Sequence, residues 1–485
     1  MFRNPHSFPR FPSLSSLPTG FLLPSLYLSV SLFLLPFNPL PTQLSMFKRA
    51  TMGIPWTLLS LSLFLSPVFV QGSLIDIDAD VGVGIGVGVG VGGGKESLVS
   101  AAWYAGWHST DFPLSKVSWN KYTHLTYSFA VTTPDVNELS LEGSNPDYLP
   151  KFVSAAKLHG VKALVSVGGW TGSLFYSSAV ATAENRTAFV KTITNFATKY
   201  KLDGIDFDWE YPGNQGIGCN VVSPNDTTNF LLFLQQLRQD PIGRNLFLTA
   251  ATSVLPWKGP QGTPLTDVSG FAKVLNYIAI MNYDISGSWL SYVGPNAPLD
   301  DSCAPAANQQ GSATAAIKAW TAAGIPENQI VLGVPSYGHS FRVPVNDAFT
   351  GTNGTGSLVA FPPFDAQDPT VGDAWDDAAG TDECGNPTGP GGNFDFWGLI
   401  DGGFLKSNGD VADGIAYRFD TCSQTPYVYN ETSQVMVSFD NAKSFAAKGS
   451  FIKENKLRGF AMWEAGGDSS DILLNSIRKS AGFHH

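Results

Sequence analysis

The sequence predicts an α/β protein built on a closed (β/α)8 TIM barrel, with a small α+β insertion between strand 7 and strand 8. Three observations support this fold class. From Leu98 onward, eight short β-rich segments alternate with longer segments of helical period. No glycine-rich dinucleotide fingerprint or P-loop follows these segments, which weakens the alternative of a doubly wound open sheet. Residues 342–436 are far more than a βα loop needs, and we expect this insertion to form a wall at the C-terminal face of the barrel.

The expected strands are short apolar or β-branched runs, and the expected helices have one apolar face. The strands are Val99–Ala105, His124–Val131, Val161–Val167, Gly204–Asp208, Phe247–Ala251, Tyr277–Met281, Ile330–Val334 and Gly459–Met462. Helical faces are formed by Phe189, Ile193, Phe196 and Tyr200, and by Phe230, Leu231, Leu234 and Leu237. Further helices are expected at Thr266–Leu275, Ser312–Ala323, Asp440–Glu454 and Asp471–Ser480, and insertion strands at Gly414–Phe419 and Tyr427–Tyr429.

The first 96 residues differ in composition from the rest. We expect residues 1–72 to be an upstream segment followed by a secretory signal peptide at about Met46–Gly72, with Met46 or Met52 as the true start. A basic start and the apolar run Ile54–Val70 favour this interpretation, and a membrane signal anchor is the alternative. Residues 73–96 are rich in Val and Gly and are expected to be a flexible linker, so the catalytic barrel is expected at residues 97–483. Together with four N-glycosylation sequons, at Asn185, Asn225, Asn353 and Asn430, these features predict a secreted, extracellular glycoprotein.

Composition narrows the possible function. The 485 residues carry a net charge of -11 and 43% hydrophobic residues, so a mainly disordered chain is excluded and a nucleic-acid partner is not expected. No stable membrane association is expected, and the protein is expected to be a monomer. Cys219, Cys303, Cys384 and Cys422 allow three disulfide connectivities, between which the sequence does not choose.

The segment Leu202–Tyr211 carries the chemistry. Because a strand has period two, Asp206, Asp208 and Glu210 share one face, which would point into the barrel. Confined carboxyls raise one another's pKa, so at least one proton should be retained, as a general acid requires. A solvated edge strand and a divalent-metal site are the alternatives, but we expect no metal and no cofactor.

Five motifs together resemble glycoside hydrolase family 18, the chitinases, and in particular its secreted fungal members. They are Asp203–Glu210 (DGIDFDWE), Ser166–Trp170 (SVGGW), Met281–Asp284 (MNYD), Gly333–Phe341 (GVPSYGHSF) and Gly459–Glu464 (GFAMWE). The resemblance covers roughly residues 97–483. It implies hydrolysis of β-1,4 bonds between N-acetylglucosamine units of chitin and chito-oligosaccharides, with retention and with the substrate acetamido group as nucleophile.

The resemblance also implies roles for individual residues. Glu210 would be the general acid/base, Asp208 would orient the acetamido group, and Asp206 would share a proton with Asp208. Tyr283 would hydrogen-bond the acetamido oxygen. The substrate-binding residues implied with them are Trp463, Asp284, Met281, Trp170, Trp289, Tyr104, Phe129, Tyr337, Tyr211 and Gly169.

Three other functions remain as alternatives. A chitinase-like lectin would keep the groove but lose the acid, whereas this sequence retains Asp206, Asp208, Glu210 and Tyr283. An endo-β-N-acetylglucosaminidase acting on N-glycans shares the acid motif, but the Met281–Asp284 motif, Trp463 and the insertion favour chitin. A structural wall protein rests only on the Val/Gly segment.

Overall fold

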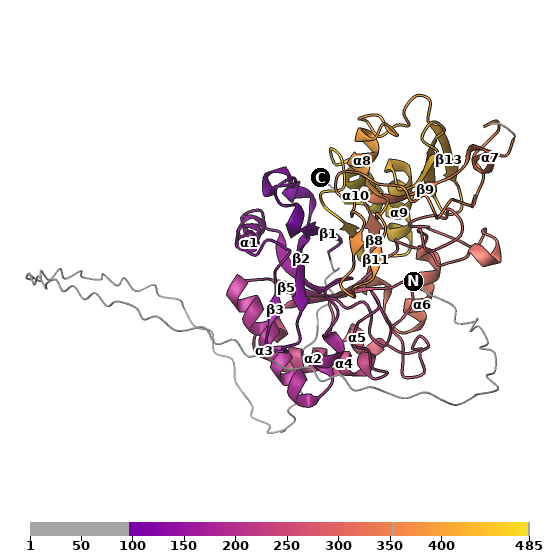
Figure 1. Ribbon diagram of the computed structural model, residues 1–485. Helices are drawn as coiled ribbons and strands as arrows, with labels where there is room; N and C mark the ends of the chain where they lie inside the picture. Colours follow the sequence, from indigo (N-terminus) through magenta and orange to yellow (C-terminus); the bar gives the residue numbers. More distant parts are fainter. Residues whose placement is uncertain (1–96, 352–353, 484–485) are drawn as a thin grey trace, which may run out of the picture. The chain divides into compact units, whose positions relative to one another are not determined.

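A computed structural model describes residues 97–351 and 354–483 (Figure 1). The expected leader at residues 1–72 and the whole of the expected linker at residues 73–96 lie outside the described residues. Within the described part of the chain, no helix is both long and apolar enough to span a bilayer.

Eight parallel strands form the barrel, as the sequence predicts. They are β1 (Val99–Ala105), β2 (His124–Thr132), β4 (Lys162–Gly168), β5 (Gly204–Asp208), β6 (Phe247–Thr252), β7 (Tyr277–Ile280), β8 (Ile330–Pro335) and β16 (Gly459–Trp463). The sheet order β1-β16-β8-β7-β6-β5-β4-β2 is closed by pairing of β1 with β2, and the short strand β3 (Leu139–Ser140) extends β2. The doubly wound alternative is therefore wrong, since an open sheet would leave two edges.

Helices surround the barrel (Figure 1). They are α1 (Leu149–Leu158), α2 (Tyr176–Val180), α3 (Ala183–Tyr200), α4 (Asp226–Gln239), α5 (Ser269–Ala272), α6 (Ala313–Ala322), α9 (Ala442–Glu454) and α10 (Ile472–Ala481). Short 3-10 turns lie at Gly106–His108, Leu114–Lys116, Trp119–Lys121, Gly243–Asn245, Ala306–Asn308 and Glu327–Gln329. Side chains cap three of the helices: Thr182 accepts from Asn185 N at 3.2 Å, Ser312 from Ala315 N at 3.3 Å, and Asn441 forms a capping box with Ser444.

One predicted helix is much shorter than expected. The segment 266–275 forms only α5, because the chain must turn toward β7 almost at once: Asn276 N already bonds to Leu248 O at 2.7 Å. Helix α1 was not predicted, although Leu149, Phe152, Val153 and Ala156 form its buried face at helical spacing.

The strands separate two apolar cores. Small and aromatic side chains fill the barrel interior: Val99, Ala101, Trp103, Ala251, Tyr277, Ala279, Val331 and Ala461. Their neighbours in sequence point outward and pack against the helices, as Ile278, Leu332 and Phe460 do. The apolar interior therefore lies below the polar groups of the site, which are at the C-terminal ends of the strands.

The insertion is an antiparallel sheet with its own core. Its five strands are β9 (Tyr337–Arg342), β12 (Asn393–Asp395), β13 (Ala416–Asp420), β14 (Thr425–Asn430) and β15 (Val435–Ser438), in the order β12-β9-β15-β14-β13. It also contains α7 (Val345–Ala348), α8 (Phe396–Asp401) and the hairpin of β10 (Gly380–Thr381) and β11 (Pro387–Thr388). The insertion between strand 7 and strand 8 of the barrel is confirmed, and its sheet begins at Tyr337, before the expected residue 342.

Two disulfides connect the insertion to loops of the barrel. Cys219 is bonded to Cys384, and Cys303 to Cys422. In each pair, the first cysteine lies in a loop after a barrel strand and the second in the insertion. The structure therefore selects one of the three connectivities that the sequence allows.

Candidate active site

The acidic residues of β5 lie inside the C-terminal end of the barrel. Asp206, Asp208 and Glu210 are 2%, 4% and 9% exposed. Because they alternate with Ile205 and Phe207, which pack outward, all three carboxyls are directed inward. The site is thus a column of three buried acids that rises toward the barrel mouth.

Asp206, at the bottom of the column, is held by three neutral donors. Its Oδ1 accepts from Thr249 Oγ1 at 2.5 Å, and its Oδ2 accepts from Ser166 Oγ at 2.8 Å and Trp103 Nε1 at 3.1 Å. Burial raises the pKa of Asp206, and these hydrogen bonds reduce the rise. Both oxygens of Asp206 are therefore occupied by neighbouring strands.

Asp208, in the middle of the column, has one carboxylate oxygen available to a ligand. Its Oδ1 is buried without a hydrogen-bond partner among the described residues. Burial and then the charges of Glu210 and Asp206 raise the pKa of Asp208 well above its usual range. A buried oxygen of this kind is suited to accept from a ligand.

Glu210 follows the end of β5. Its backbone is fixed at both ends, since its N–H donates to Ser173 Oγ at 3.1 Å and its carbonyl accepts from Asn220 Nδ2 at 2.8 Å. Burial raises its pKa to about 7, the charge of Asp284 adds to the rise, and a hydrogen bond from Tyr211 lowers it. Near neutral pH, Glu210 is therefore able both to give and to take a proton.

Tyr283 and Asp284 follow β7 on another side of the mouth. Tyr283 is 8% exposed, and burial together with the charge of Asp208 raises its pKa, so it stays a hydrogen-bond donor. Asp284 has a left-handed backbone, with φ 54°, and its Oδ1 accepts from Tyr337 OH at 2.6 Å and lies 2.8 Å from His339 Nε2. Desolvation opposes ionisation of Asp284, but these contacts outweigh it and lower the pKa.

Aromatic rings line the opposite side. Trp463, at the end of β16, stacks on Phe129 at 5.5 Å between ring centroids and meets the edge of Trp103 at 6.0 Å. Trp107 extends this set, stacked on Phe129 at 6.0 Å, and is 43% exposed. A flat apolar surface facing polar groups is typical of sugar sites.

Two glycines at the end of β4 allow the chain to pass close to the site. Gly168 and Gly169 have φ of 105° and 84°. A Cβ on Gly168 would lie 2.2 Å from the Asp208 carbonyl oxygen, and one on Gly169 would lie 2.9 Å from the Phe129 ring. The predicted Gly169 thus shapes the wall by having no side chain.

The other predicted binding residues fall in three groups. Tyr211 and Tyr337 are partly buried beside Glu210 and Asp284, and Met281 packs against the barrel interior. Trp289 is 39% exposed, with its ring 5.6 Å from His339, and Trp170 is partly exposed in the loop after β4.

Tyr104 does not belong to the site. It is 0% exposed in the outer core, where it stacks on Tyr127 and Tyr148 and donates to Phe112 O at 2.6 Å. Its neighbour Trp103 is the one that points inward, since adjacent strand residues face opposite sides. The expectation for Tyr104 was therefore wrong by one residue of register.

Sequence reasoning also missed several residues that act on the site. Trp103 and Thr249 bond Asp206, and His339 contacts Asp284. The positions of Trp103 and Thr249 on predicted strands were the signal that could have found them, whereas nothing in the sequence predicts a contact between His339 and Asp284. Among the described residues, no group of three or more His, Cys, Asp or Glu is arranged to hold a metal ion.

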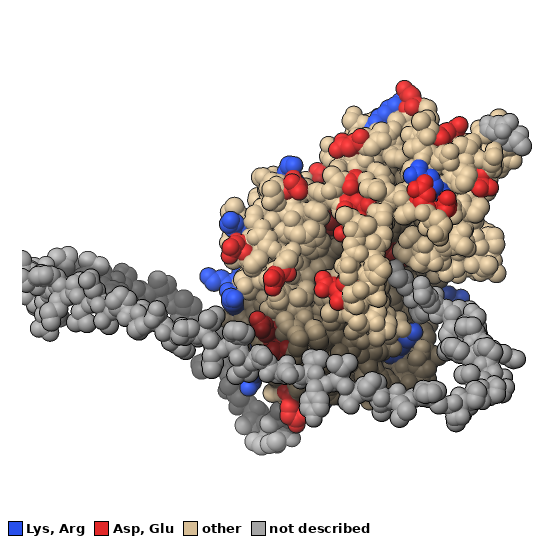
Figure 2. All heavy atoms as spheres, in the orientation of Figure 1, with Lys and Arg blue, Asp and Glu red and all other residues tan. Residues whose placement is uncertain are grey.

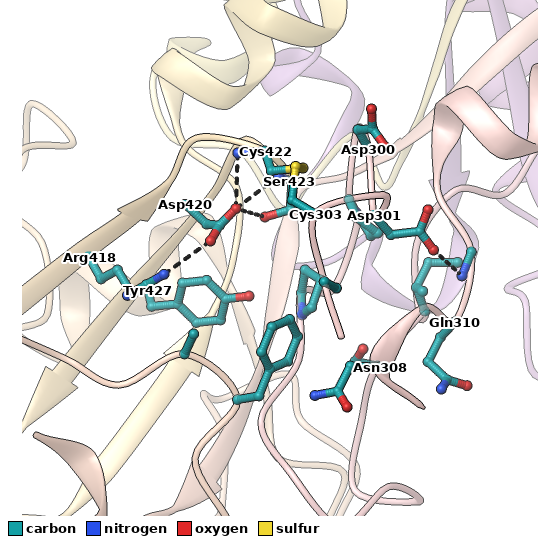
Figure 3. A pocket seen from close by; sticks show the side chains of 18 of the residues that line it. Asp300, Asp301, Cys303, Asn308, Gln310, Arg418, Asp420, Cys422, Ser423 and Tyr427 are labelled. Carbon is teal, nitrogen blue, oxygen red and sulfur yellow. Dashed lines mark hydrogen bonds and ion pairs between the residues drawn. A yellow bond between two sulfur atoms is a disulfide. The ribbon is translucent and has the colours of Figure 1, made fainter. Parts of the chain in front are cut away.

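A separate small pocket lies where the loop after β7 meets the insertion hairpin β13–β14 (Figure 3). Its polar side chains are largely engaged with each other: Arg418 pairs with Asp420 at 3.1 Å, and Asp420 Oδ1 accepts from Cys422 N at 3.0 Å and Ser423 N at 2.9 Å. The disulfide of Cys303 with Cys422 lines it. None of the acidic column lines this pocket, which we interpret as a seam between barrel and insertion.

Comparisons with known proteins identify relatives of this chain. The sequence profile described as glycosyl hydrolases family 18 matches residues 99–468. A "chitinase-like effector" of Moniliophthora roreri is 55% identical over 79% of this chain and 93% of its own length, and one of Moniliophthora perniciosa is 51% identical over 79% and 87%. Among solved structures, a chitinase from Rhizomucor miehei aligns with a TM-score of 0.70 and 32% identity, covering 79% of this chain and 99% of that one.

Proposed function

Because the chain belongs to the glycosyl hydrolases of family 18, we propose that it is a chitinase that cleaves β-1,4 bonds between N-acetylglucosamine units. The observation that carries this proposal is the buried column of Asp206, Asp208 and Glu210, in which the uppermost acid has a pKa raised to about 7. A proton donor with this pKa fits the transfer of a proton to a glycosidic oxygen near neutral pH.

The first step uses the proton on Glu210. Glu210 protonates the glycosidic oxygen while the acetamido oxygen of the same sugar attacks C1, so the leaving sugar departs and an oxazolinium ring forms. The unpartnered Oδ1 of Asp208 supports its role as acceptor for the acetamido N–H. The strongly raised pKa of Asp208 also implies that its ionised form is stabilised when a hydrogen-bond donor or the positively charged ring lies beside it.

The second step reverses the proton flow. Glu210, now ionised, takes a proton from the water that attacks C1, so the ring opens and the original configuration is restored. Tyr283, kept protonated by burial, would donate to the acetamido oxygen. Asp284, held ionised by Tyr337 and His339, would accept from a sugar hydroxyl.

The aromatic side chains supply the platform. Trp463, backed by Phe129 and Trp103, would contact the apolar face of the sugar at the point of cleavage. Trp170 and Trp289 would line the leaving-group side, with Met281, Tyr337 and Tyr211 shaping the pocket. Gly169 would leave room for the Phe129 ring.

The test is turnover of a chito-oligosaccharide with a chromogenic leaving group. We expect cleavage with retention at early times, and we expect Glu210→Gln to remove nearly all turnover while chito-oligosaccharide binding persists. Retained hydrolysis by that variant would disprove the role of Glu210. Inverted products, or equal cleavage of substrates without the N-acyl group, would disprove the substrate-assisted route.

A second candidate is a binding protein for chito-oligosaccharides without turnover. The names of the two Moniliophthora relatives favour it, since both are called chitinase-like effectors. Against it, this chain keeps the acid, the column below it and Tyr283. Binding by the unaltered protein without any cleavage would favour this second function.

We further propose that the protein is secreted and acts outside the cell as a monomer. Two disulfides fit an oxidising compartment. The sequence features of the segment Met46–Gly72 support a signal peptide cleaved before Ser73. N-terminal sequencing of the mature protein tests this, and a mature chain that retains Met1 would refute it.

A further inference from the structure

The two ends of the Cys219–Cys384 disulfide come from opposite sides of the barrel mouth. Around the closed sheet, β5 and β16 are separated by the same number of strands in either direction. Cys219 lies in the loop after β5, and Cys384 lies in the insertion that joins β8 to β16. The part of the insertion that carries Cys384 therefore reaches from the β16 side of the mouth toward the loop after β5.

The crossing segment is residues 376–392, here called the strap, which contains the hairpin β10–β11. At its root, the Asp376 carboxylate accepts from the backbone N–H groups of Gly372, Gly392 and Asn393 at 2.8, 3.0 and 2.9 Å. Next to the root, Trp375 stacks on His108 of the loop after β1, with ring centroids 3.8 Å apart. The root of the strap is thus fixed to both the insertion and the barrel.

The tip of the strap is fixed beside the proton donor. Asp382 Oδ1 shapes the tip by accepting from Cys384 N at 2.9 Å and Asn386 N at 2.7 Å. Cys384 is bonded to Cys219, and the residue after Cys219, Asn220, donates to the carbonyl of Glu210 at 2.8 Å. The tip is therefore held by the loop that holds Glu210.

Between root and tip, the strap spans open space. All four residues of β10 and β11 are exposed, although neighbouring strand residues point to opposite faces. A hairpin lying on the barrel would bury one of these faces. In the view of Figure 1, β11 lies in front of the barrel, and Figure 2 shows the surface hollowed on either side of it.

The disulfide is the main restraint on the tip. Residues 377–391 contain no large apolar side chain, so burial contributes little to docking. The hairpin pairs only Gly380 with Thr388 and Thr381 with Pro387, and so short a ladder is marginal alone. Without the bond from Cys219 to Cys384, the tip would move away from the mouth.

We propose that the strap closes the groove into a passage, so that a chito-oligosaccharide enters by a free end and not by lying down from the side. This inference rests on the proposed function and adds the form of substrate that the site takes. Chain ends and short oligosaccharides are admitted, whereas internal segments of a chain with both ends obstructed are excluded.

The test is binding of capped chains of N-acetylglucosamine units. One probe carries a bulky protein cap on one end through a flexible linker, and the other carries caps on both ends. Full-length protein with Glu210→Gln prevents cleavage during the measurement. We expect the doubly capped chain to bind at least tenfold more weakly than the singly capped chain, and Cys219→Ser with Cys384→Ser to abolish most of this difference.

The second disulfide provides a matched control. Cys303→Ser with Cys422→Ser removes the same kind of bond from the seam of Figure 3 and should leave the discrimination unchanged. A second opened form, lacking residues 380–388 and carrying Cys219→Ser, guards against misfolding of the first and should also admit the doubly capped chain.

Each other outcome overturns a defined statement. Equal binding of both probes by the intact protein, or unchanged discrimination in both opened forms, would overturn the strap proposal and leave the proposed function standing. Failure of the intact protein to bind even an uncapped chain would overturn the proposed function and the strap proposal together.

Discussion

Tyr211 should set the pH at which Glu210 loses its proton. The Tyr211 hydroxyl hydrogen-bonds the Glu210 carboxylate and lowers its pKa, while burial raises that pKa to about 7. Tyr211→Phe removes one oxygen atom and keeps the ring. A hydrogen bond to a charged group contributes about 1.5–3 kcal/mol, and one pKa unit corresponds to about 1.4 kcal/mol. Loss of this bond disfavours the ionised form, so the pKa of Glu210 should rise by roughly one to two units.

The assay is the pH dependence of kcat/KM on a chromogenic chito-oligosaccharide. In the unaltered protein, the alkaline limb should lie near pH 7, where free Glu210 loses its proton. In Tyr211→Phe, the limb should move to roughly pH 8–9. Tyr104→Phe is the matched control, since its hydroxyl bonds Phe112 O in the outer core, and its limb should stay in place. A limb that stays or moves to lower pH in Tyr211→Phe would refute the reasoning.

Three further perturbations test other parts of the structure. Burial raises the pKa of Glu464 to about 7, so the protonated side chain contributes stability that is fully present below pH 4.5 and is lost as pH rises through 7. Glu464→Gln should flatten the fall in Tm over this pH range by removing on the order of 3 kcal/mol of pH-dependent stability, and an unchanged slope of Tm against pH would contradict this expectation. Lys448 Nζ lies 2.6 Å from Asp440 Oδ1 with both side chains buried, so Lys448→Met should lower the free energy of unfolding by about 3–5 kcal/mol in urea titrations. Adding Asp440→Asn should recover much of this lost free energy, and no recovery would mean that lost packing dominates. Gly169→Ala should reduce kcat/KM at least tenfold. Gly160→Ala is the control and should leave kcat/KM unchanged, because Gly160 also has a positive φ, of 69°, but has nothing within 4 Å of an added Cβ. Equal losses of kcat/KM in both variants would assign the effect to backbone strain alone.

The barrel was predictable because its signals are local. Each strand is a short apolar run, and the observed bounds differ from the expected ones by at most one residue at either end. The column of Asp206, Asp208 and Glu210 was predictable for the same reason, since alternation along one strand assigns all three to one face. Helix α1 has an equally local signal in the helical spacing of its buried face, although it was not among the predicted helices.

The rest of the site depends on contacts between distant segments. Trp103 and Asp206 are 103 residues apart, and only closure of the barrel brings the indole N–H to the carboxylate. Alternation along β1 allows either Trp103 or Tyr104 to face the barrel interior, and the expectation that Tyr104 lines the pocket was wrong. The contacts of His339 with Asp284, and of Cys219 with Cys384, join the insertion to loops of the barrel, and no local pattern encodes them.

The mouth holds two carboxyls whose pKa values are shifted in opposite directions, and their neighbours explain why. Glu210 receives one opposing hydrogen bond against full burial and the charge of Asp284, so its proton is retained to about pH 7. Asp284 receives a phenol and an imidazole on one oxygen, so its proton is lost more readily than usual. The shift at Asp284 supports the one at Glu210, because an ionised Asp284 holds the proton on Glu210. The insertion supplies Tyr337 and His339, and it therefore influences the acid as well as the shape of the groove.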